Sequence, residues 1–387
     1  MAYVLFDPST RDHFAPLSTT KAVADFRMGI LSVKERWELL LKEEVFVHTV
    51  GYLQALYTTP SAANHTWIDA TVLPNELLIE QITQLKLGAS FSDAIGLIAG
   101  KSDIAFDRFN VLTTQSYFNN SIKVADVARV EFPWELMQLN EMMIREDFKL
   151  VTKGRKSQPI SPTVQLVQQA DIFIEEGAKL EFCTLNSTTG PIYIGKQAEI
   201  MEGTTVRGPF SMGFNSVLKM NSRIYGATSL GPYCMGGGEI KNSIMMGYSN
   251  KAHDGYMGDS VIGEWCNFGA GSSNSNLKNS AGSIDVWSMG LGKKVAVGQK
   301  CGVIMGDYSR LSINSSVNTG SVIGVSCNVF GAGLLPKLIQ HFSWGVDGKK
   351  YNLESAINDI NNWKYMKGKK LSDAEIQVLN HIFQSNL

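Results

Sequence analysis

The chain has 387 residues, a formal net charge of -1 and 44% hydrophobic residues. A chain of this length holds two domains, or one domain with appendages, and can bury large cores. The near-neutral charge gives no basis for electrostatic capture of nucleic acid, and no apolar run reaches membrane-spanning length. The five cysteines form no C-x-x-C pair and are expected to be buried thiols. We therefore expect a soluble cytoplasmic protein with neither a nucleic-acid nor a membrane partner.

Residues 1–155 show no long-range repeat and are expected to form a mixed α/β domain. An apolar strand is predicted at residues 3–6, before a polar turn. A helix is predicted after Ser32, where the spacing is that of a capping box, and further helices are predicted after Pro74 and Pro133. A polar linker then leads out of this domain.

The next segment, residues 160–345, has a period of six residues. Neither a helix nor a flat strand explains this period, whereas stacked coils do, because each coil buries its apolar face against its neighbours. The pattern predicts a triangular prism of short parallel strands with aliphatic residues inside, followed by a helical tail at residues 346–387. The aliphatic positions are Ile194, Ile200, Val206, Met212, Leu218, Ile224 and Leu230, and later Met305, Leu311, Val317, Ile323 and Val329.

The period is interrupted in three places. Ten residues separate Leu230 from Ile240, and the excess over one repeat lies in residues 235–238. A second stretch with more residues than the repeat requires includes residues 250–256, and a third irregular stretch covers residues 272–294. Interruptions of a rigid repeat are common sites of function, so we expect polar loops and a cleft along one flank of the prism.

The polar residues near these interruptions suit a phosphorylated ligand that is rich in hydroxyl groups. Arg223 and Lys241 could hold a phosphate. Asn267 and Asn276 offer donors and acceptors for sugar hydroxyls, and His253 is of the residue type that accepts protons near neutrality. Each also has a structural interpretation: a surface charge, an asparagine in a tight corner, or an exposed histidine. The pattern alone leaves both interpretations open.

Residues 250–271 resemble a known signature. They are similar to the K-A-x-H-x-x-Y-x-G-D-x-x-I-G-x-x-x-N-x-G-A-G motif of the bacterial bifunctional N-acetylglucosamine-1-phosphate uridylyltransferase/glucosamine-1-phosphate acetyltransferase family. That resemblance implies a nucleotidyltransferase domain followed by a left-handed parallel β-helix that acts as a homotrimer. The left hand is implied by the resemblance and not by the repeat.

The resemblance also assigns roles to individual residues. It implies that His253 is the general base for transfer of an acetyl group from acetyl-CoA to an amino-sugar 1-phosphate, and that Ala270 lies near the coenzyme. Leu277 and Gly282 depart from the pattern, which has an aromatic residue and a lysine there. The residues implied to bind the sugar phosphate are Arg223, Lys241, Tyr256, Asn267 and Asn276.

The N-terminal segment resembles a subgroup of sugar nucleotidyltransferase/acetyltransferase proteins with a shortened first domain. The phosphate-binding glycines of the usual L-x-x-G-x-G-T-R opening are missing, and Asp7 stands in that stretch. The resemblance implies nucleotide-binding roles for Arg11, Lys21 and Arg27, with a nucleoside triphosphate and Mg²⁺ as partners if the domain is active. Asp69 is the nearest candidate for a metal-binding aspartate and could equally be a turn residue, so the metal ligands stay unassigned.

Three functions remain to be distinguished. The first is an acetyl-CoA-dependent N-acetyltransferase on an amino-sugar 1-phosphate, with glucosamine 1-phosphate as the expected substrate, fused to a nucleotidyltransferase-like domain that serves nucleotide-sugar synthesis. The second is a sugar-phosphate nucleotidyltransferase whose β-helix serves oligomerisation or regulation. The third is a non-enzymatic trimeric scaffold.

Overall fold

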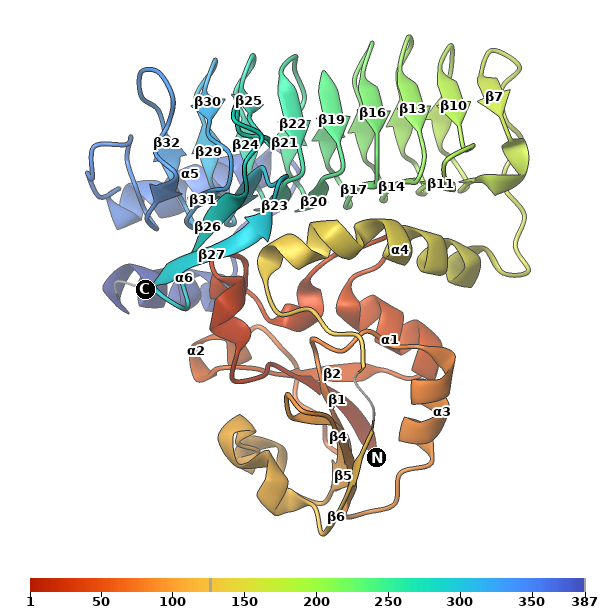
Figure 1. Ribbon diagram of the computed structural model, residues 1–387, viewed down its shortest axis with the longest axis vertical. Helices are drawn as coiled ribbons and strands as arrows, with labels where there is room; N and C mark the ends of the chain where they lie inside the picture. Colours follow the sequence, from red (N-terminus) through yellow and green to blue (C-terminus); the bar gives the residue numbers. More distant parts are fainter. Residues whose placement is uncertain (125–126, 386–387) are drawn as a thin grey trace. The chain divides into compact units, whose positions relative to one another are not determined.

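The computed structural model describes residues 1–124 and 127–385 (Figure 1). The chain divides into two compact units. The first unit consists of residues 1–13, 21–26 and 31–131, and the second unit of residues 14–20, 27–30 and 132–387.

The first unit is built on a six-stranded mixed sheet of order β2-β1-β3-β5-β4-β6. Strand β1 runs parallel to β2 and β3, whereas β5 runs antiparallel to β3 and β4. Both β1 and β3 are buried along their whole length, as expected of central strands covered on both faces. The strands are β1 (Ala2–Phe6), β2 (Val45–His48), β3 (His65–Asp69), β4 (Ala89–Ser92), β5 (Leu97–Ser102) and β6 (Asn120–Lys123).

The helices of the first unit are α1 (Val33–Leu41), α2 (Gly51–Gln54) and α3 (Glu76–Thr83), with a 3₁₀ segment η5 at Val111–Tyr117. The predicted capping box at the start of α1 is confirmed. Ser32 Oγ accepts the Glu35 N–H at 3.2 Å, and the Ser32 N–H donates to Glu35 Oε2 at 2.7 Å.

The second unit contains a left-handed parallel β-helix whose three long sheets confirm the predicted fold class (Figure 1). Face one consists of β7 (Gln165–Val167), β10 (Thr184–Asn186), β13 (Thr205–Arg207), β16 (Arg223–Tyr225), β19 (Glu239–Lys241) and β22 (Tyr256–Gly258), followed by β25 (Ser273–Asn274) and β30 (Ser316–Val317). Face two consists of β8 (Ile172–Ile174), β11 (Ile192–Ile194), β14 (Phe210–Met212), β17 (Thr228–Leu230), β20 (Ile244–Gly247), β23 (Val261–Glu264), β28 (Val303–Met305), β31 (Ser321–Ile323) and β33 (Leu338–Ile339). Face three consists of β9 (Lys179–Leu180), β12 (Glu199–Ile200), β15 (Val217–Leu218), β18 (Met235–Gly236), β21 (Asn250–Lys251), β24 (Asn267–Phe268), β29 (Arg310–Leu311) and β32 (Asn328–Val329).

The six-residue repeat fills the interior as predicted. All twelve aliphatic positions of the repeat lie in one continuous buried cluster. Strand neighbours such as Ile200 and Leu218 pair in register, so interior side chains form straight columns along the prism. Apolar contact between successive coils therefore stabilises the stack along its length.

Two of the expected loops are wrong. Gly236 takes an interior position, because a side chain there would meet Leu218, Leu230 and Ile240. Leu230 and Gly236 are thus separated by a full repeat of six residues, and Gly236 and Ile240 by a repeat shortened to four. No loop is inserted between them. Residues 250–256 likewise form β21, a corner and the start of β22. The interior residue of β20 is Met245.

The third irregular stretch contains a true insertion. Strands β26 (Ile284–Ser288) and β27 (Lys293–Gly298) pair as an antiparallel hairpin between β25 and β28. Ile284 and Val286 are fully buried, so one side of the hairpin is part of the packed structure.

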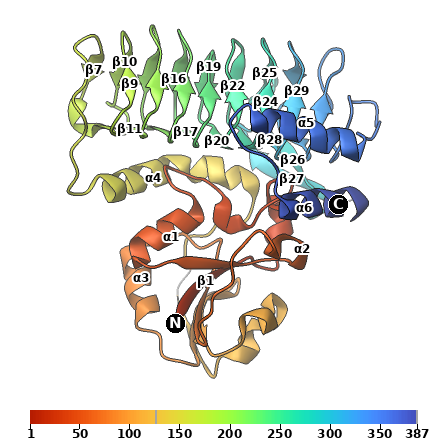
Figure 2. The ribbon, with the colours of Figure 1, turned by 180° about the vertical axis from the view of Figure 1, so that it is seen from behind.

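Three helices accompany the β-helix in the second unit (Figure 2). They are α4 (Pro133–Thr152), α5 (Leu353–Tyr365) and α6 (Asp373–Ser385). On α4, Asn140 Nδ2 donates to the Ala227 carbonyl at 2.7 Å and its Oδ1 accepts the Ser229 hydroxyl at 3.0 Å. The helix expected after Pro133 therefore exists, but it packs on face two, so the packing units do not divide at residue 155.

Two smaller expectations can be compared with the structure. All five cysteines are buried free thiols, as predicted, and burial raises the pKa of Cys234 to about 11. Within the described residues, no helix combines the length and the apolar character that crossing a membrane would require.

The close stacking of coils predicts a strong effect of a single methyl group. A β-carbon at Gly195 would lie 2.6 Å from the carbonyl carbon of Gly213 and 2.7 Å from the Met212 carbonyl oxygen, and backbone cannot move aside. We expect Gly195→Ala to lower the free energy of unfolding by about 1–3 kcal/mol through overpacking. The matched change Gly282→Ala, whose nearest neighbour would be 3.5 Å away, should have almost no effect in the same denaturant titration. Equal stability of the two variants would contradict the packing described here.

Candidate functional site

Face one carries two rows of outward-facing polar residues in register. Arg223, Glu239 and Tyr256 are aligned in one row. Tyr225 and Lys241 are aligned in the next row, two residues further along their strands. Because side chains at i and i+2 share a face and neighbouring strands are one strand spacing apart, these side chains form one continuous surface.

The charges on this surface are unbalanced. Tyr225 Oη donates to Glu239 Oε1 at 2.6 Å, and this bond raises the pKa of Tyr225 to about 12. Among the described residues, neither Arg223 nor Lys241 has a carboxylate partner within ion-pair distance. Arg223 and Lys241 therefore point outward from face one on adjacent coils, and the one carboxylate in these rows, Glu239, is bonded to Tyr225. Tyr225 was not predicted, although its position two residues after Arg223 already placed it on the same face.

Tyr256 is held over its own strand. Its hydroxyl lies over Gly258, where any β-carbon would overlap it. Burial, followed by the Asp259 carboxylate, raises the pKa of Tyr256. Asp259 also accepts a hydrogen bond from Asn276 and one from Asn242 Nδ2, the latter at 2.7 Å. The buried Asp259 thus brings the predicted residue Asn276 to the side of the prism that carries Tyr256.

His253 and Ala270 lie on successive turns of the corner between face three and face one. The His253 side chain is exposed, and its ring makes no hydrogen bond to any residue of the described chain. A backbone hydrogen bond joins the two turns, because the Gly271 N–H donates to the Asp254 carbonyl at 3.1 Å. The Ala270 carbonyl accepts the N–H of Asn314 on the following turn at 2.8 Å. The corner therefore presents the imidazole from a rigid backbone.

A buried lysine supports this corner from inside the prism. Lys251 occupies the interior column between Gly236 and Phe268, and its side chain is almost completely buried. Its ammonium donates to the Gly237 carbonyl at 3.0 Å and to the carbonyl of His253. Burial lowers the pKa of Lys251 to about 8. Gly236, its neighbour in the column, leaves the space that the lysine side chain needs. Neither residue was predicted to lie in the interior, because the repeat predicts an aliphatic residue at both positions.

Asn267 lies on a different face from the cations. It is aligned with Asn250 and Arg310 on face three, just before the corner that carries Ala270. One chain therefore presents Arg223 and Lys241 from one side of the corner and Asn267 from the other.

The three predicted nucleotide-binding residues do not form a cluster within one unit. Arg11 is buried and donates to Asp7 Oδ2 at 3.1 Å and to Asp12 Oδ1 at 2.9 Å. Lys21 is buried in the first unit. Arg27 belongs to the second unit and donates to a backbone carbonyl three residues further on. Their role in nucleotide binding stays a prediction.

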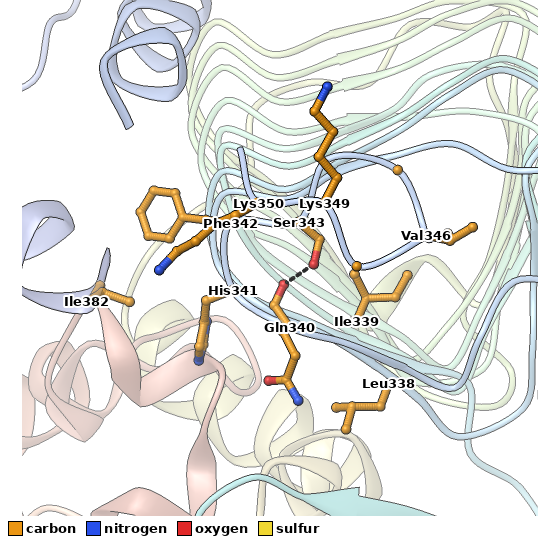
Figure 3. A pocket seen from close by; sticks show the side chains of 12 residues that line it. Leu338, Ile339, Gln340, His341, Phe342, Ser343, Val346, Lys349, Lys350 and Ile382 are labelled. Carbon is orange, nitrogen blue, oxygen red and sulfur yellow. Dashed lines mark hydrogen bonds between the residues drawn. The ribbon is translucent and has the colours of Figure 1, made fainter. Parts of the chain in front are cut away.

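A cavity of about 420 Å³ lies at the C-terminal end of the β-helix (Figure 3). His341 Nδ1 accepts the Val325 N–H at 2.9 Å, and burial lowers the pKa of His341 to about 4, so the ring is neutral at physiological pH. Lys350 donates to the Phe383 carbonyl at 2.9 Å and lies 4.1 Å above its ring. These polar groups serve the packing of the chain end, and the candidate site is the face-one surface with its corner.

Comparison with known proteins relates this chain to enzymes that act on sugar phosphates. Residues 3–156 match the family model described as sugar nucleotidyl transferase. The bifunctional protein GlmU of Methanocaldococcus jannaschii is 29% identical over 225 residues, which cover 56% of this chain and 45% of the relative. The chain is related to such proteins. The resemblance expected from its sequence is confirmed.

Two further similarities were found. The bifunctional sugar-1-phosphate nucleotidylyltransferase/acetyltransferase of Sulfurisphaera tokodaii is 34% identical over 148 residues, covering 36% of this chain and 35% of the relative. The chain thus spans less than half the length of these relatives. A solved structure of Arabidopsis UDP-N-acetylglucosamine acyltransferase matches with a TM-score of 0.34 and 13% identity, over 58% of this chain and 90% of that one.

The buried lysine generates a pH-dependent prediction. A lysine pKa that is lower in the folded than in the unfolded state means that the unfolded chain binds more protons between the two values, so stability rises with pH there. We expect the free energy of unfolding of the wild type, measured relative to Lys251→Met, to rise by about 1–3 kcal/mol between pH 8 and pH 10.5. Denaturant titrations of both proteins across this range test it, and a difference that stays flat would contradict the buried position.

Proposed function

We propose that this protein is an acetyl-CoA-dependent N-acetyltransferase that acts on an amino-sugar 1-phosphate, with glucosamine 1-phosphate as the first substrate to test. The observation that carries the proposal is the pair of cations on face one, Arg223 and Lys241, which form no ion pair among the described residues and share the face that begins at the corner of His253. The names of the related bifunctional nucleotidylyltransferase/acetyltransferases support the same reaction class. A scaffold would leave this arrangement of charges without a purpose.

The two cations would bind the phosphate of the substrate. A guanidinium offers paired donors and an ammonium a compact charge, and together they match a phosphate dianion. Tyr256, Asn276 and Asn267 would hydrogen-bond to the sugar, which positions its amine at the corner. Positioning of this kind supplies a large part of the rate acceleration when two substrates must meet.

His253 would act as the general base. As the substrate nitrogen attacks the thioester carbonyl, a C–N bond forms and the C–S bond breaks. The imidazole accepts the proton that the amine loses, and the departing thiolate of coenzyme A takes up a proton to become the thiol. Proton transfer from a positioned base contributes about 10²–10⁴-fold to such a rate. Acetyl-CoA would lie along the turn of Ala270, one coil from His253.

The division of residues between two faces supports a shared site in a homotrimer. Arg223 and Lys241 on face one and Asn267 on face three point away from each other across a convex corner. A second copy packed along this corner would convert it into a cleft that encloses the substrate. Most soluble oligomers consist of copies of one chain related by closed symmetry, which a trimer of this kind would have.

The acetylated sugar phosphate would serve nucleotide-sugar synthesis. We propose that the protein is located in the cytoplasm. Five free cysteines, all buried, fit a reducing compartment.

The first prediction for this function concerns the base. With glucosamine 1-phosphate and acetyl-CoA, release of free thiol should be rapid for the wild type, and His253→Ala should lower kcat by about 10²–10⁴-fold with a small change in KM. The matched control is His381→Ala, an exposed histidine on α6, which should leave kcat unchanged. Full kcat in His253→Ala at saturating substrates would remove the proposed base.

A second prediction concerns assembly. Analytical ultracentrifugation of the full chain should show a species with three times the mass of one chain. Dilution below the dissociation constant should abolish acetyl transfer, because each site would lose one of its walls. A monomer with undiminished activity would contradict the shared site and leave the assignment of the base untouched.

A further inference from the structure

The first unit contains a cavity of its own, of about 580 Å³. It lies where the parallel strands β1 and β3 end, at Phe6 and Asp69, and it is bordered by the turn at residues 8–10 and by η5. Ligands of α/β proteins commonly bind outside the carboxyl ends of parallel strands. The position is therefore that of a binding site.

One arginine at the base of this cavity is surrounded by carboxylates. The side chain of Arg129 is 3% exposed. Its Nη1 lies 2.6 Å from Asp69 Oδ2, and its Nε lies 2.8 Å from Asp93 Oδ2. The remaining Asp69 oxygen accepts the N–H and the hydroxyl of Thr71, at 2.8 Å and 2.7 Å. Asp93 Oδ1 accepts the backbone N–H groups of Ile95 and Gly96.

These residues do not fit the magnesium ion that nucleotidyl transfer requires. Mg²⁺ needs carboxylate oxygens whose lone pairs are available, in octahedral geometry. Asp69 is the aspartate that the sequence offered for this role, and both of its oxygens are already used. No group of three or more histidine, cysteine or acidic residues suited to a metal occurs in the described part of the chain. The guanidinium of Arg129 lies where a cation would have to bind.

The cavity also lacks charges that could hold a triphosphate. Arg129 is the one cation among the described residues that line it, and two carboxylates neutralise its charge. Arg11 follows the stretch in which related enzymes have the phosphate-binding glycines. It donates hydrogen bonds to Asp7 and Asp12 and does not line the cavity. A ligand with three or four negative charges would find no compensation here.

Apart from Asp69, Arg129 and Glu131, the polar lining consists of neutral hydrogen-bonding groups. They come from the turn after β1 and from η5, and apolar surface from Leu97 and Leu112 lies beside them. Hydroxyl and amide groups of this kind pair with ligand hydroxyls as both donors and acceptors. The side chains concerned are Ser9, Thr10, Thr113, Thr114, Gln115 and Ser116.

We propose that this cavity binds an uncharged carbohydrate, either a free sugar or the ribose of a nucleoside, without a divalent cation. The first unit would then recognise a polyhydroxyl ligand and would not transfer nucleotides. The proposal does not depend on the acetyltransferase reaction, because none of the residues involved lies in the second unit.

Isothermal titration calorimetry of the full chain tests the proposal with four probes: N-acetylglucosamine, uridine, UTP with MgCl₂, and MgCl₂ alone. We expect one of the two neutral probes to bind with an affinity that EDTA does not change, and UTP with MgCl₂ to bind at least about tenfold more weakly. Binding of N-acetylglucosamine would indicate a sugar site, and binding of uridine would indicate a nucleoside site. Tighter binding of UTP that disappears in EDTA would overturn the proposal, as would the absence of binding by both neutral probes.

Two variants assign the binding to this cavity. Thr10→Trp should fill the cavity and weaken binding of the neutral probe by at least about tenfold. Thr83→Trp, at an exposed position of α3 outside the cavity, is the matched control and should bind as the wild type does. Equal binding by both variants would place the ligand elsewhere and overturn the proposal.

A third variant tests the role of Arg129 directly. Arg129→Ser removes the countercharge of Asp69 and Asp93, so this variant should unfold at a lower temperature and should be stabilised by MgCl₂, by a few degrees. The wild type should show no such response in the same thermal scan. Stabilisation of the wild type by MgCl₂ would contradict the proposal even if the variant failed to fold.

Discussion

The structure of the second unit depends on one constraint: consecutive coils must stack in register, strand upon parallel strand. Each interior residue then rests on the one below it, and each outward residue stands one strand spacing from its counterparts. Apolar columns inside and polar rows outside follow from this single alignment. Arg223, Glu239 and Tyr256 are neighbours in space only because the coils that carry them are in register.

The same constraint selects which surface is available for chemistry. Face two is covered where Asn140 of α4 bonds to Ala227 and Ser229. Face three is partly covered where Arg310 lies 5.4 Å from the ring centre of Trp363 on α5. Face one keeps its half-exposed charged rows, and the corner beside it carries an exposed imidazole. The cations in those rows favour an anionic substrate, whereas the cavity of the first unit, with its arginine neutralised, favours a neutral one.

The sequence predicted the regular part of the molecule well and the irregular part poorly. A six-residue period is visible wherever the interior residue is aliphatic, so the fold and the buried columns could be predicted from it. Where the interior residue is Gly236 or Lys251, the period disappears although the coil continues, and the two loops expected there are wrong. The Arg129 pairs could not be predicted either, because they join residues 36 and 60 positions apart through the fold of the sheet.

The central claim is that face one and its corner hold one substrate between them. A structure of the full chain determined with glucosamine 1-phosphate and coenzyme A tests this claim most directly. Our account predicts the phosphate between Arg223 and Lys241, the amine turned toward His253, and the coenzyme thiol beside Ala270. A phosphate bound away from both cations, or a sugar whose amine is turned away from the imidazole, would contradict it.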